Sequence, residues 1–342
     1  MNRVVVVTGA SSGIGRELAV QLAERGDTVV LAARGEEALD ETAEACQRAG
    51  GECLVVPTDV SQREEVERLR RAAIEAYGGF DAWVNNAGVT YFATLTSGEM
   101  DDHVRVVETN LFGAMYGARA AVTHFLERGR GVLVNVSSIL GKTGQPFVPS
   151  YVISKHGIRG LSEALRAELA DEPDIHVCTI FPYATDTPHF ELAGTNMNRR
   201  ARAMPPAQSP EAVARAIVRL LDRPRREVHV PRIAAAGLLL TKLFPKTSER
   251  LLLHALREFH FDERLESKGE GNLYEPTGEP GHVHGDRPPQ VSTPKLAVWA
   301  VRELARIEAD EARRFFRRRA GRPPRGVRET PRRRHDDHAP RP

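Results

Sequence analysis

The stretch Thr8-Gly9-Ala10-Ser11-Ser12-Gly13-Ile14-Gly15 decides the fold of this 342-residue chain. It follows the β-branched run 3–7, which is typical of a central strand buried on both faces of a parallel sheet. It precedes residues 16–25, where apolar side chains recur with helical spacing. Such a strand–glycine turn–helix unit aims backbone N–H groups and the positive end of the helix at a phosphate. A glycine-rich loop without a function is the alternative, but the strand before and the helix after favour the phosphate site.

Strands and helices then alternate along the chain. Further strands are expected at residues 27–33, 52–56, 82–85, 131–136, 175–181 and 227–230. Helical patterns cover residues 36–48, 62–77, 149–170 and 210–223, and a long one runs through Phe125. Right-handed crossovers between parallel strands place helices on both faces of a sheet. The sequence therefore predicts an α/β fold with a doubly wound parallel sheet, the Rossmann fold, whose ligands bind at the carboxyl ends of the strands.

A candidate proton-transfer site lies between Ser138 and Lys155. Tyr151 and Lys155 are four residues apart, so on a helix both side chains project from one face. A neighbouring lysine cation lowers the pKa of a phenol from its usual value near ~10 toward the working range. Ser138 follows a predicted strand and is able to hydrogen-bond the same substrate oxygen. By itself, a Tyr-x-x-x-Lys pair is common on surface helices, so the other motifs must support this interpretation.

In order and spacing these motifs resemble those of the classical short-chain dehydrogenases/reductases, over roughly the first 230 residues. The resemblance rests on the turn at Thr8 to Gly15, the loop Asn85-Asn86-Ala87-Gly88, and Asn110, Ser138, Tyr151 and Lys155. It implies that Tyr151 is the acid/base, Lys155 lowers its pKa and holds the ribose, Ser138 polarises the carbonyl, and Asn110 supports a water relay. Taken alone, Asn110 also fits a solvated or capping residue.

The resemblance also implies the cofactor contacts. These are Gly9, Ser11, Ser12, Gly13, Ile14, Gly15, Asp59, Val60, Asn86, Ala87, Gly88, Tyr151, Lys155, Pro182 and Thr187. Tyr183 stands where the family usually has glycine, and a bulky residue there would be strained if the backbone took an unusual angle. Residues 186–208 are expected to form a mobile substrate lid.

Arg34 determines the predicted choice of cofactor. An acidic residue after the second strand would accept hydrogen bonds from a ribose 2′-hydroxyl, whereas a guanidinium pairs bidentately with a 2′-phosphate. We therefore predict NADP(H) over NAD(H). The alternative is that Arg34 is a solvated loop arginine.

The chain is predicted to hold one main domain and a mostly helical C-terminal extension. The expected parts are a catalytic domain at 1–231, an apolar helical extension at 232–268, a Gly/Pro-rich linker at 269–292, a helix at 293–320 and a basic, disordered tail at 321–342. The apolar segment 233–244 fits a helix over the substrate entrance, a dimer contact or a segment dipping into a bilayer, and the first two are favoured. His282 and His284 lie in a loop without a third ligand, so we expect no metal site.

Composition limits the partners and the compartment. The formal net charge of +2 gives no indication of a nucleic-acid partner, although arginines are concentrated near the end of the chain. Three cysteines without metal-ligand spacing, and no leader peptide, indicate a reducing cytoplasm. No apolar run approaches the about 20 residues of a spanning helix. Peripheral membrane contact stays open as an alternative, without support from a motif.

The sequence thus predicts an NADP(H)-dependent oxidoreductase that transfers hydride between nicotinamide and a carbonyl or secondary alcohol. The family resemblance implies a homodimer or homotetramer. The alternatives are a non-catalytic NADP(H) sensor, or a protein that docks on membranes or nucleic acid. The substrate does not follow from the lid's composition, because one methylene changes binding by only ~1–3 kcal/mol.

Overall fold

Seven parallel strands form one sheet in the computed structural model, which describes residues 2–231, 238, 241–265, 267–278, 281–286 and 293–319. The strands are β1 (Val4–Thr8), β2 (Thr28–Ala33), β3 (Cys53–Pro57), β4 (Ala82–Asn85), β6 (Gly131–Val136), β7 (Ile175–Pro182) and β10 (Glu227–Val230). Their order across the sheet is β10-β7-β6-β4-β1-β2-β3. The order reverses between β1 and β4, and the carboxyl ends of such strands border the crevice in which ligands bind.

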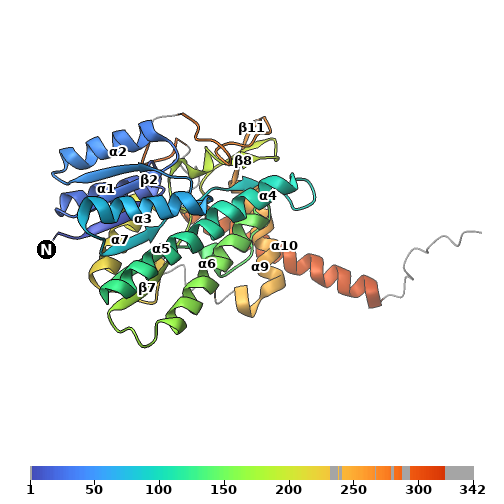
Figure 1. The fold of residues 1–342 in the computed structure, drawn as a ribbon. Helices are drawn as coiled ribbons and strands as arrows, with labels where there is room; N and C mark the ends of the chain where they lie inside the picture. Colours follow the sequence, from blue (N-terminus) through green and yellow to red (C-terminus); the bar gives the residue numbers. More distant parts are fainter. Residues whose placement is uncertain are drawn as a thin grey trace, which may run out of the picture.

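Helices cover both faces of the sheet (Figure 1). One layer contains α1 (Gly13–Glu24), α2 (Glu36–Arg48) and α7 (Pro210–Asp222), and the other contains α3 (Arg63–Tyr77), α5 (Gly113–Arg128) and α6 (Pro149–Glu168). The valines of β1 show why both layers form. Val5 and Val7 are buried under the first layer and Val6 under the second, because successive side chains of a strand point to opposite faces. The predicted doubly wound α/β fold is confirmed.

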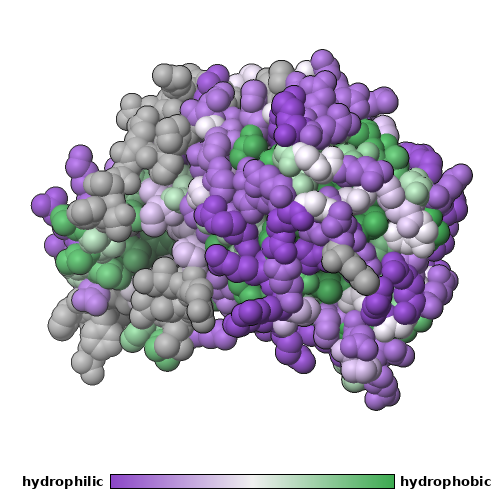
Figure 2. Space-filling model, turned by 90° about the vertical axis from the view of Figure 1, so that its left-hand side faces the viewer, coloured by the Kyte–Doolittle hydropathy of each residue, from purple (hydrophilic) through white to green (hydrophobic). Residues whose placement is uncertain are grey.

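The outward faces of the helices are polar, as their amphipathic sequences require. Seen from the side of α1 and α2, hydrophilic residues cover most of the surface, and hydrophobic residues gather toward its left edge (Figure 2). The predicted bounds of α2, β4, β6 and β10 agree with the structure at every residue. The Ser209 side chain caps α7 by accepting a hydrogen bond from Ala212 N.

One predicted helix is divided into three parts. The pattern through Phe125 comprises α4 (Met100–Val107), a π-helical turn at Glu108–Phe112, and α5. A π-helical turn often marks a functional position in a helix. Asn110 lies inside this turn.

The predicted lid, residues 186–208, is tied to two other parts of the chain. It holds a short 3₁₀ helix (Pro188–Phe190), β8 (Gly194–Thr195) and β9 (Arg199–Ala201). β8 pairs with β5 (Tyr91–Phe92), and β9 pairs with β11 (Phe261–Leu265). The lid therefore joins the main domain to the C-terminal extension, and its mobility stays a prediction.

The described part of the extension contains α9 (Pro245–Phe259), β11 and α10 (Thr293–Arg319), which begins at the predicted residue. Phe259 and Trp299 pack edge to face with centroids 4.9 Å apart, which joins α9 to α10. In Figure 1, α10 extends away from the sheet. The predicted tail 321–342 and most of the predicted apolar segment 233–244 lie outside the described residues. Among the described helices, none is long and apolar enough to cross a membrane.

Candidate active site

The glycine turn between β1 and α1 leaves a cradle that side chains would fill. Gly9 has a φ of +67°, and a Cβ there would lie 2.8 Å from Ala87 Cα. A Cβ on Gly15 would lie 2.0 Å from the carbonyl oxygen of Gly9. Gly13 has a φ of +53° and lies against the Thr187 side chain. Only glycine fits these positions, and the resulting cradle at a helix N-terminus fits the phosphates of a nucleotide cofactor.

Ser138, Tyr151 and Lys155 meet at the carboxyl end of β6. Ser138 Oγ accepts a hydrogen bond from Leu140 N at 3.2 Å, which fixes the serine at the start of a short 3₁₀ helix. The Tyr151 phenol hydrogen-bonds the Ser138 side chain. Lys155 Nζ lies 5.3 Å from the centroid of the Tyr151 ring and donates to the Val136 carbonyl at 3.0 Å. The three predicted side chains therefore form one contact group.

Asn110 lies behind this group and is buried, so the reading as a solvated residue is wrong. Its Oδ1 accepts from Val89 N at 2.8 Å, and its Nδ2 donates to Val89 O at 3.0 Å and Ser154 Oγ at 3.1 Å. A Cβ on Gly88 would approach both Asn110 Oδ1, at 3.3 Å, and Lys155 Nζ, at 3.6 Å. The π-helical turn thus brings Asn110 next to Lys155, while its part in a water relay stays a prediction.

The expected lowering of the Tyr151 pKa is wrong for this structure. Burial raises the pKa of Tyr151 to about 12, even though the hydrogen bond with Ser138 acts in the opposite direction. Burial also lowers the pKa of Lys155 to about 8. Both shifts have one cause, since a site shielded from water disfavours the phenolate and the ammonium alike. The phenol is therefore protonated at neutral pH and suited to donating a proton.

Residues 272–278 and 281–286, which we call the C-terminal strap, lie across the cofactor end of the site. Gly13 N donates to the carbonyl oxygen of His282 at 2.8 Å, so the strap touches the glycine turn directly. The Gly/Pro-rich composition predicted a linker or a loose loop at 269–292. The described parts are irregular in backbone, as expected, but they are bound to the main domain rather than loose.

Arg34 anchors the strap at the end of β2. Its Nη1 donates to the carbonyl oxygens of Leu273 at 3.1 Å and Tyr274 at 2.8 Å, and its Nη2 donates to that of Asn272 at 2.5 Å. The alternative of a solvated loop arginine is therefore wrong. A guanidinium carries five N–H donors, and Arg34 uses its donors to make three hydrogen bonds to the strap.

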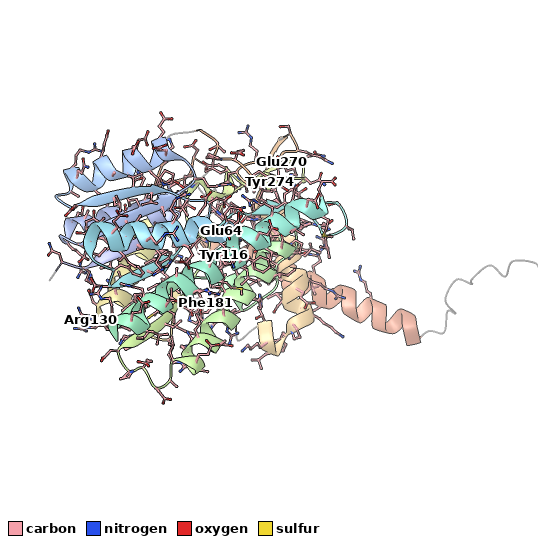
Figure 3. The ribbon with its side chains drawn as sticks, in the orientation of Figure 1. Glu64, Tyr116, Arg130, Phe181, Glu270 and Tyr274 are labelled. Atoms are coloured by element: carbon pink, nitrogen blue, oxygen red, sulfur yellow. The ribbon has the colours of Figure 1, made fainter. Side chains whose placement is uncertain are left out.

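A second anchor joins the strap to α4 and to the loop after β3. The Tyr274 hydroxyl donates to Asp102 Oδ1 at 3.1 Å, and Figure 3 shows Tyr274 above α4. Arg105 Nε donates to the Leu273 carbonyl at 3.0 Å while its Nη2 pairs with Asp59 Oδ2 at 2.8 Å. Burial would raise the pKa of Asp59, but its hydrogen bonds with Arg105 and Ser61 outweigh burial and hold that pKa below its usual range. Asp59, a predicted cofactor contact, thus already has an arginine partner.

The turn after β7 has an ordinary backbone despite its bulky residue. Pro182 ends the strand, and Tyr183 N donates to Val230 O at 2.8 Å, which extends the pairing with β10. Strain was expected at Tyr183 only if its backbone took an unusual angle. Its φ is not positive, so the backbone at Tyr183 is not strained in this way. Thr187 is buried beside Gly13, which brings this turn to the cofactor end of the site.

The cavity at the carboxyl ends of the strands has a volume of about 1390 Å³. Pockets for a single ligand are commonly ~300–1,000 Å³, so this cavity has room for a cofactor and a second molecule. Every predicted site residue lines it except Gly15 and Asn110, which lie directly behind the lining. Apolar residues form the wall away from the glycine turn, among them Phe92, Val148, Phe190, Met204, Leu252 and Leu253.

The sequence did not point to two histidines of the cavity wall, His189 and His260. His189 Nε2 lies 2.6 Å from Thr90 Oγ1, and its ring centroid lies 5.8 Å from that of Tyr151. Burial, together with the nearby Lys155 charge, lowers the pKa of His189 to about 4. Its position two residues after Thr187 was the available signal. His260 carried no such signal, because it lies far down the chain in the extension.

Comparison with known proteins supports the family. The model of the short chain dehydrogenase family matches residues 3–198. YxnA, an uncharacterised oxidoreductase of Bacillus subtilis, is 37% identical over 278 residues, which cover 80% of this chain and 78% of that protein. This match is longer than the predicted domain 1–231, so it includes part of the extension. The 3beta-hydroxysteroid dehydrogenase 1 of Eggerthella lenta is 39% identical over 188 residues, 54% of this chain and 72% of that protein.

Solved structures agree with the sequence matches. An alcohol dehydrogenase of the archaeon Thermococcus sibiricus, complexed with 5-hydroxy-NADP, has a TM-score of 0.60 and 28% identity, covering 67% of this chain and 96% of that one. A short-chain dehydrogenase/reductase of Burkholderia phymatum in complex with NAD has a TM-score of 0.66 and 26% identity, covering 72% and 95%. With the sheet order, the glycine cradle and the Ser138–Tyr151–Lys155 group, these matches show that the chain belongs to the short-chain dehydrogenase/reductase family of oxidoreductases.

Proposed function

We propose that this protein is an NADP(H)-dependent oxidoreductase that transfers a hydride between the nicotinamide and the carbon of a carbonyl or secondary alcohol. One observation carries the proposal: Ser138, Tyr151 and Lys155 border the same cavity as the glycine turn. Groups suited to moving a proton therefore share one space with a cradle suited to phosphates.

The proposed chemistry divides the work between cofactor and protein. A bound nicotinamide supplies or accepts the hydride. In the direction of reduction, the Tyr151 hydroxyl donates its proton to the carbonyl oxygen as negative charge develops there. Ser138 hydrogen-bonds the same oxygen, and the Lys155 ammonium stabilises the phenolate that remains. Asn110 holds the backbone at Val89 and the Ser154 hydroxyl, and we assign it to the support of a water relay.

The preference for NADP(H) over NAD(H) rests on Arg34. Its guanidinium lines the cavity after β2, where cofactors of this fold place the adenine ribose. A 2′-phosphate pairs with a guanidinium more strongly than a 2′-hydroxyl does. Since three hydrogen bonds of Arg34 hold the strap, the phosphate either takes the remaining donors or replaces the carbonyl oxygens of the strap.

The apolar wall favours a bulky small-molecule substrate. Phe92, Phe190 and Leu252 line the end of the cavity away from the glycine turn. The similarity to a 3beta-hydroxysteroid dehydrogenase supports a ring-containing alcohol or ketone of that size.

We also propose a homodimer or homotetramer that works in the cytoplasm. Large apolar side chains are exposed on α4, α5 and α6, including Val104 at 45%, Met115 at 43% and Ile153 at 55%. Exposed apolar groups that lie on neighbouring elements often mark an interface. The described cysteines are all free, as is typical of proteins in a reducing compartment.

Replacement of Tyr151 by Phe tests the proposal. We expect NADPH oxidation with a panel of ketones and aldehydes to fall at least ~1,000-fold, since a positioned acid contributes about 10²–10⁴. Binding of NADPH, followed by its fluorescence, should persist because the ring stays in place. Retention of most activity would refute the mechanism. Tight NADPH binding by the wild-type protein, without oxidation across the panel, would support the non-catalytic sensor instead.

A further inference from the structure

His260 is a buried histidine that the proposed reaction does not use. It lies between α9 and β11, is 2% exposed, and lines the cavity. Its backbone is held in place, because Arg202 N donates to the His260 carbonyl at 2.9 Å. The backbone position of His260 is therefore set by the pairing of the lid with the extension.

Neither ring nitrogen of His260 has a hydrogen-bond partner in the described structure. Burial is the main cause that lowers the pKa of His260 to about 4; the Arg202 backbone acts in the opposite direction and the Arg202 charge acts in the same direction as burial, so the imidazole is neutral. A neutral imidazole carries one donor and one acceptor, and leaving both unpaired in the interior is costly. A buried histidine with two unpaired ring nitrogens therefore needs a physical explanation.

Aromatic rings surround His260, and among the described residues the polar group that acts on it is Arg202. Its ring centroid lies 5.3 Å from that of Phe92, 5.8 Å from Phe190 and 5.3 Å from Phe261. A phenylalanine at position 260 would pack among these rings without any unpaired nitrogen. Packing alone therefore does not account for a histidine. A metal role also lacks support, because no group of three or more candidate ligands exists among the described residues.

The chain of rings relates His260 to the reacting group. Tyr151 neighbours His189 at 5.8 Å, His189 neighbours Phe190 at 5.7 Å, and Phe190 neighbours His260 at 5.8 Å, all between centroids. All four residues line one cavity. His260 is thus separated from the phenol by the rings of His189 and Phe190.

We infer that His260 is a specificity-determining residue that hydrogen-bonds a second, uncharged oxygen of the substrate, remote from the carbonyl that is reduced. The substrate class is then a bulky, mainly apolar ketone or alcohol with a further hydroxyl or keto group at its opposite end. This inference rests on the proposed function, because it places the first oxygen at Tyr151.

Matched ketones test the inference. The first pair is a steroid ketone reduced on its A ring, with and without a second ketone on its D ring. The second pair is a decalone with and without a hydroxyl on the far ring. For the wild-type protein, we expect kcat/KM to favour the doubly oxygenated member of at least one pair by roughly 10- to 100-fold, the usual effect of leaving one buried partner unpaired.

Three variants separate recognition from structure. His260→Phe should abolish the preference while the singly oxygenated ketone is still reduced, and His260→Gln, which keeps a donor and an acceptor, should restore part of it. His229→Phe is the matched control, because His229 also has an unpaired ring nitrogen but does not line the cavity. It should keep the full preference.

The outcomes of these experiments distinguish failure of the inference about His260 from failure of the proposed function. No preference in the wild-type protein, or a preference that survives in His260→Phe, overturns the inference. Reduction of small ketones from the panel but of none of the four test ketones overturns the substrate class and leaves the proposed function standing. If no carbonyl compound supports NADPH oxidation, the proposed function fails and the inference fails with it.

Discussion

At the scale of single residues, the cavity wall holds two histidines that stay neutral. Burial is the first cause for both, and it brings the pKa of His189 and of His260 to about 4. A histidine in the unfolded chain has a pKa near ~6.5. The unfolded state therefore binds more protons than the folded state between these two values, so stability is lost as the pH falls through this window.

This difference predicts steep acid destabilisation. Each histidine should cost roughly 3 kcal/mol of stability on going from pH 7 to pH 4. Urea unfolding across this range should show a smaller loss for His260→Phe than for the wild-type protein. His156→Gln, which removes an exposed histidine of α6, serves as the control. Equal losses in His260→Phe and the wild-type protein would contradict the assigned protonation state.

Arg34 combines two roles at one position, since it lines the cofactor end of the cavity and also anchors the strap. We predict that Arg34→Asp lowers the ratio of kcat/KM for NADPH to that for NADH by roughly 100-fold, because a charge-assisted pair is replaced by repulsion. Steady-state turnover with both reduced cofactors measures the ratio.

The control for Arg34 is Tyr274→Phe. It removes the strap's hydrogen bond to Asp102 without changing the group that would meet a 2′-phosphate. Its ratio should match that of the wild-type protein. An unchanged ratio in Arg34→Asp would refute the preference for NADP(H), and an equal fall in both variants would assign the effect to the strap.

At the scale of elements, the strap closes one side of the cofactor cleft although it contains no helix or strand in its described parts. Tyr274 holds one end on α4. At the other end, His284 lies 3.3 Å from Asp186 and 2.7 Å from Glu211, which joins the strap to the lid and to α7. Cofactor entry and release are therefore expected to require a shift of the strap.

Loosening both ends should speed the release of cofactor. We predict a several-fold faster dissociation of NADPH from the double variant Tyr274→Phe/His284→Ala, measured by stopped-flow displacement of its fluorescence. His282→Ala is the control, since His282 accepts the hydrogen bond from Gly13 N through its backbone carbonyl and that carbonyl is retained. Equal dissociation rates in all three proteins would show that the strap does not control release.

At the scale of the whole molecule, the chain after β10 completes the site instead of forming a separate body. The strap walls the cofactor end of the cavity, while α9 and His260 wall the substrate end. The dehydrogenase domain alone would leave both ends more open. The extension therefore lines both ends of the cavity. It leaves the outer faces of α5 and α6 uncovered in Figure 1.

Those outer faces predict the assembly. A charged residue at Met115 should separate the subunits, because burying an unpaired lysine in an apolar interface is costly. Light scattering should report a monomer for Met115→Lys and an oligomer for the wild-type protein. Val301→Lys, at an exposed position on α10, is the control and should keep the oligomer. A monomeric wild-type protein would refute the proposed assembly.

The sequence by itself determined the local features. The β-branched runs and helical spacings encode strands and helices through near-neighbour sterics, so bounds such as those of α2 and β6 were predictable. The glycine spacing encodes a turn that no side chain can enter. The same local logic placed Tyr151 and Lys155 on one face of α6, together with the cap at Ser209.

The tertiary structure decided everything that depends on distant partners. Arg34 donates a hydrogen bond to the carbonyl oxygen of Tyr274, which is 240 residues away, and the spacing of the motifs does not predict that contact. The direction of the Tyr151 pKa shift was likewise missed, because burial is its largest cause and burial is a property of the packed fold. His260 enters the cavity only because the extension folds back on the lid. Local patterns thus set the scaffold and the reacting groups, whereas long-range packing sets their charge states, their enclosure and the far wall of the site.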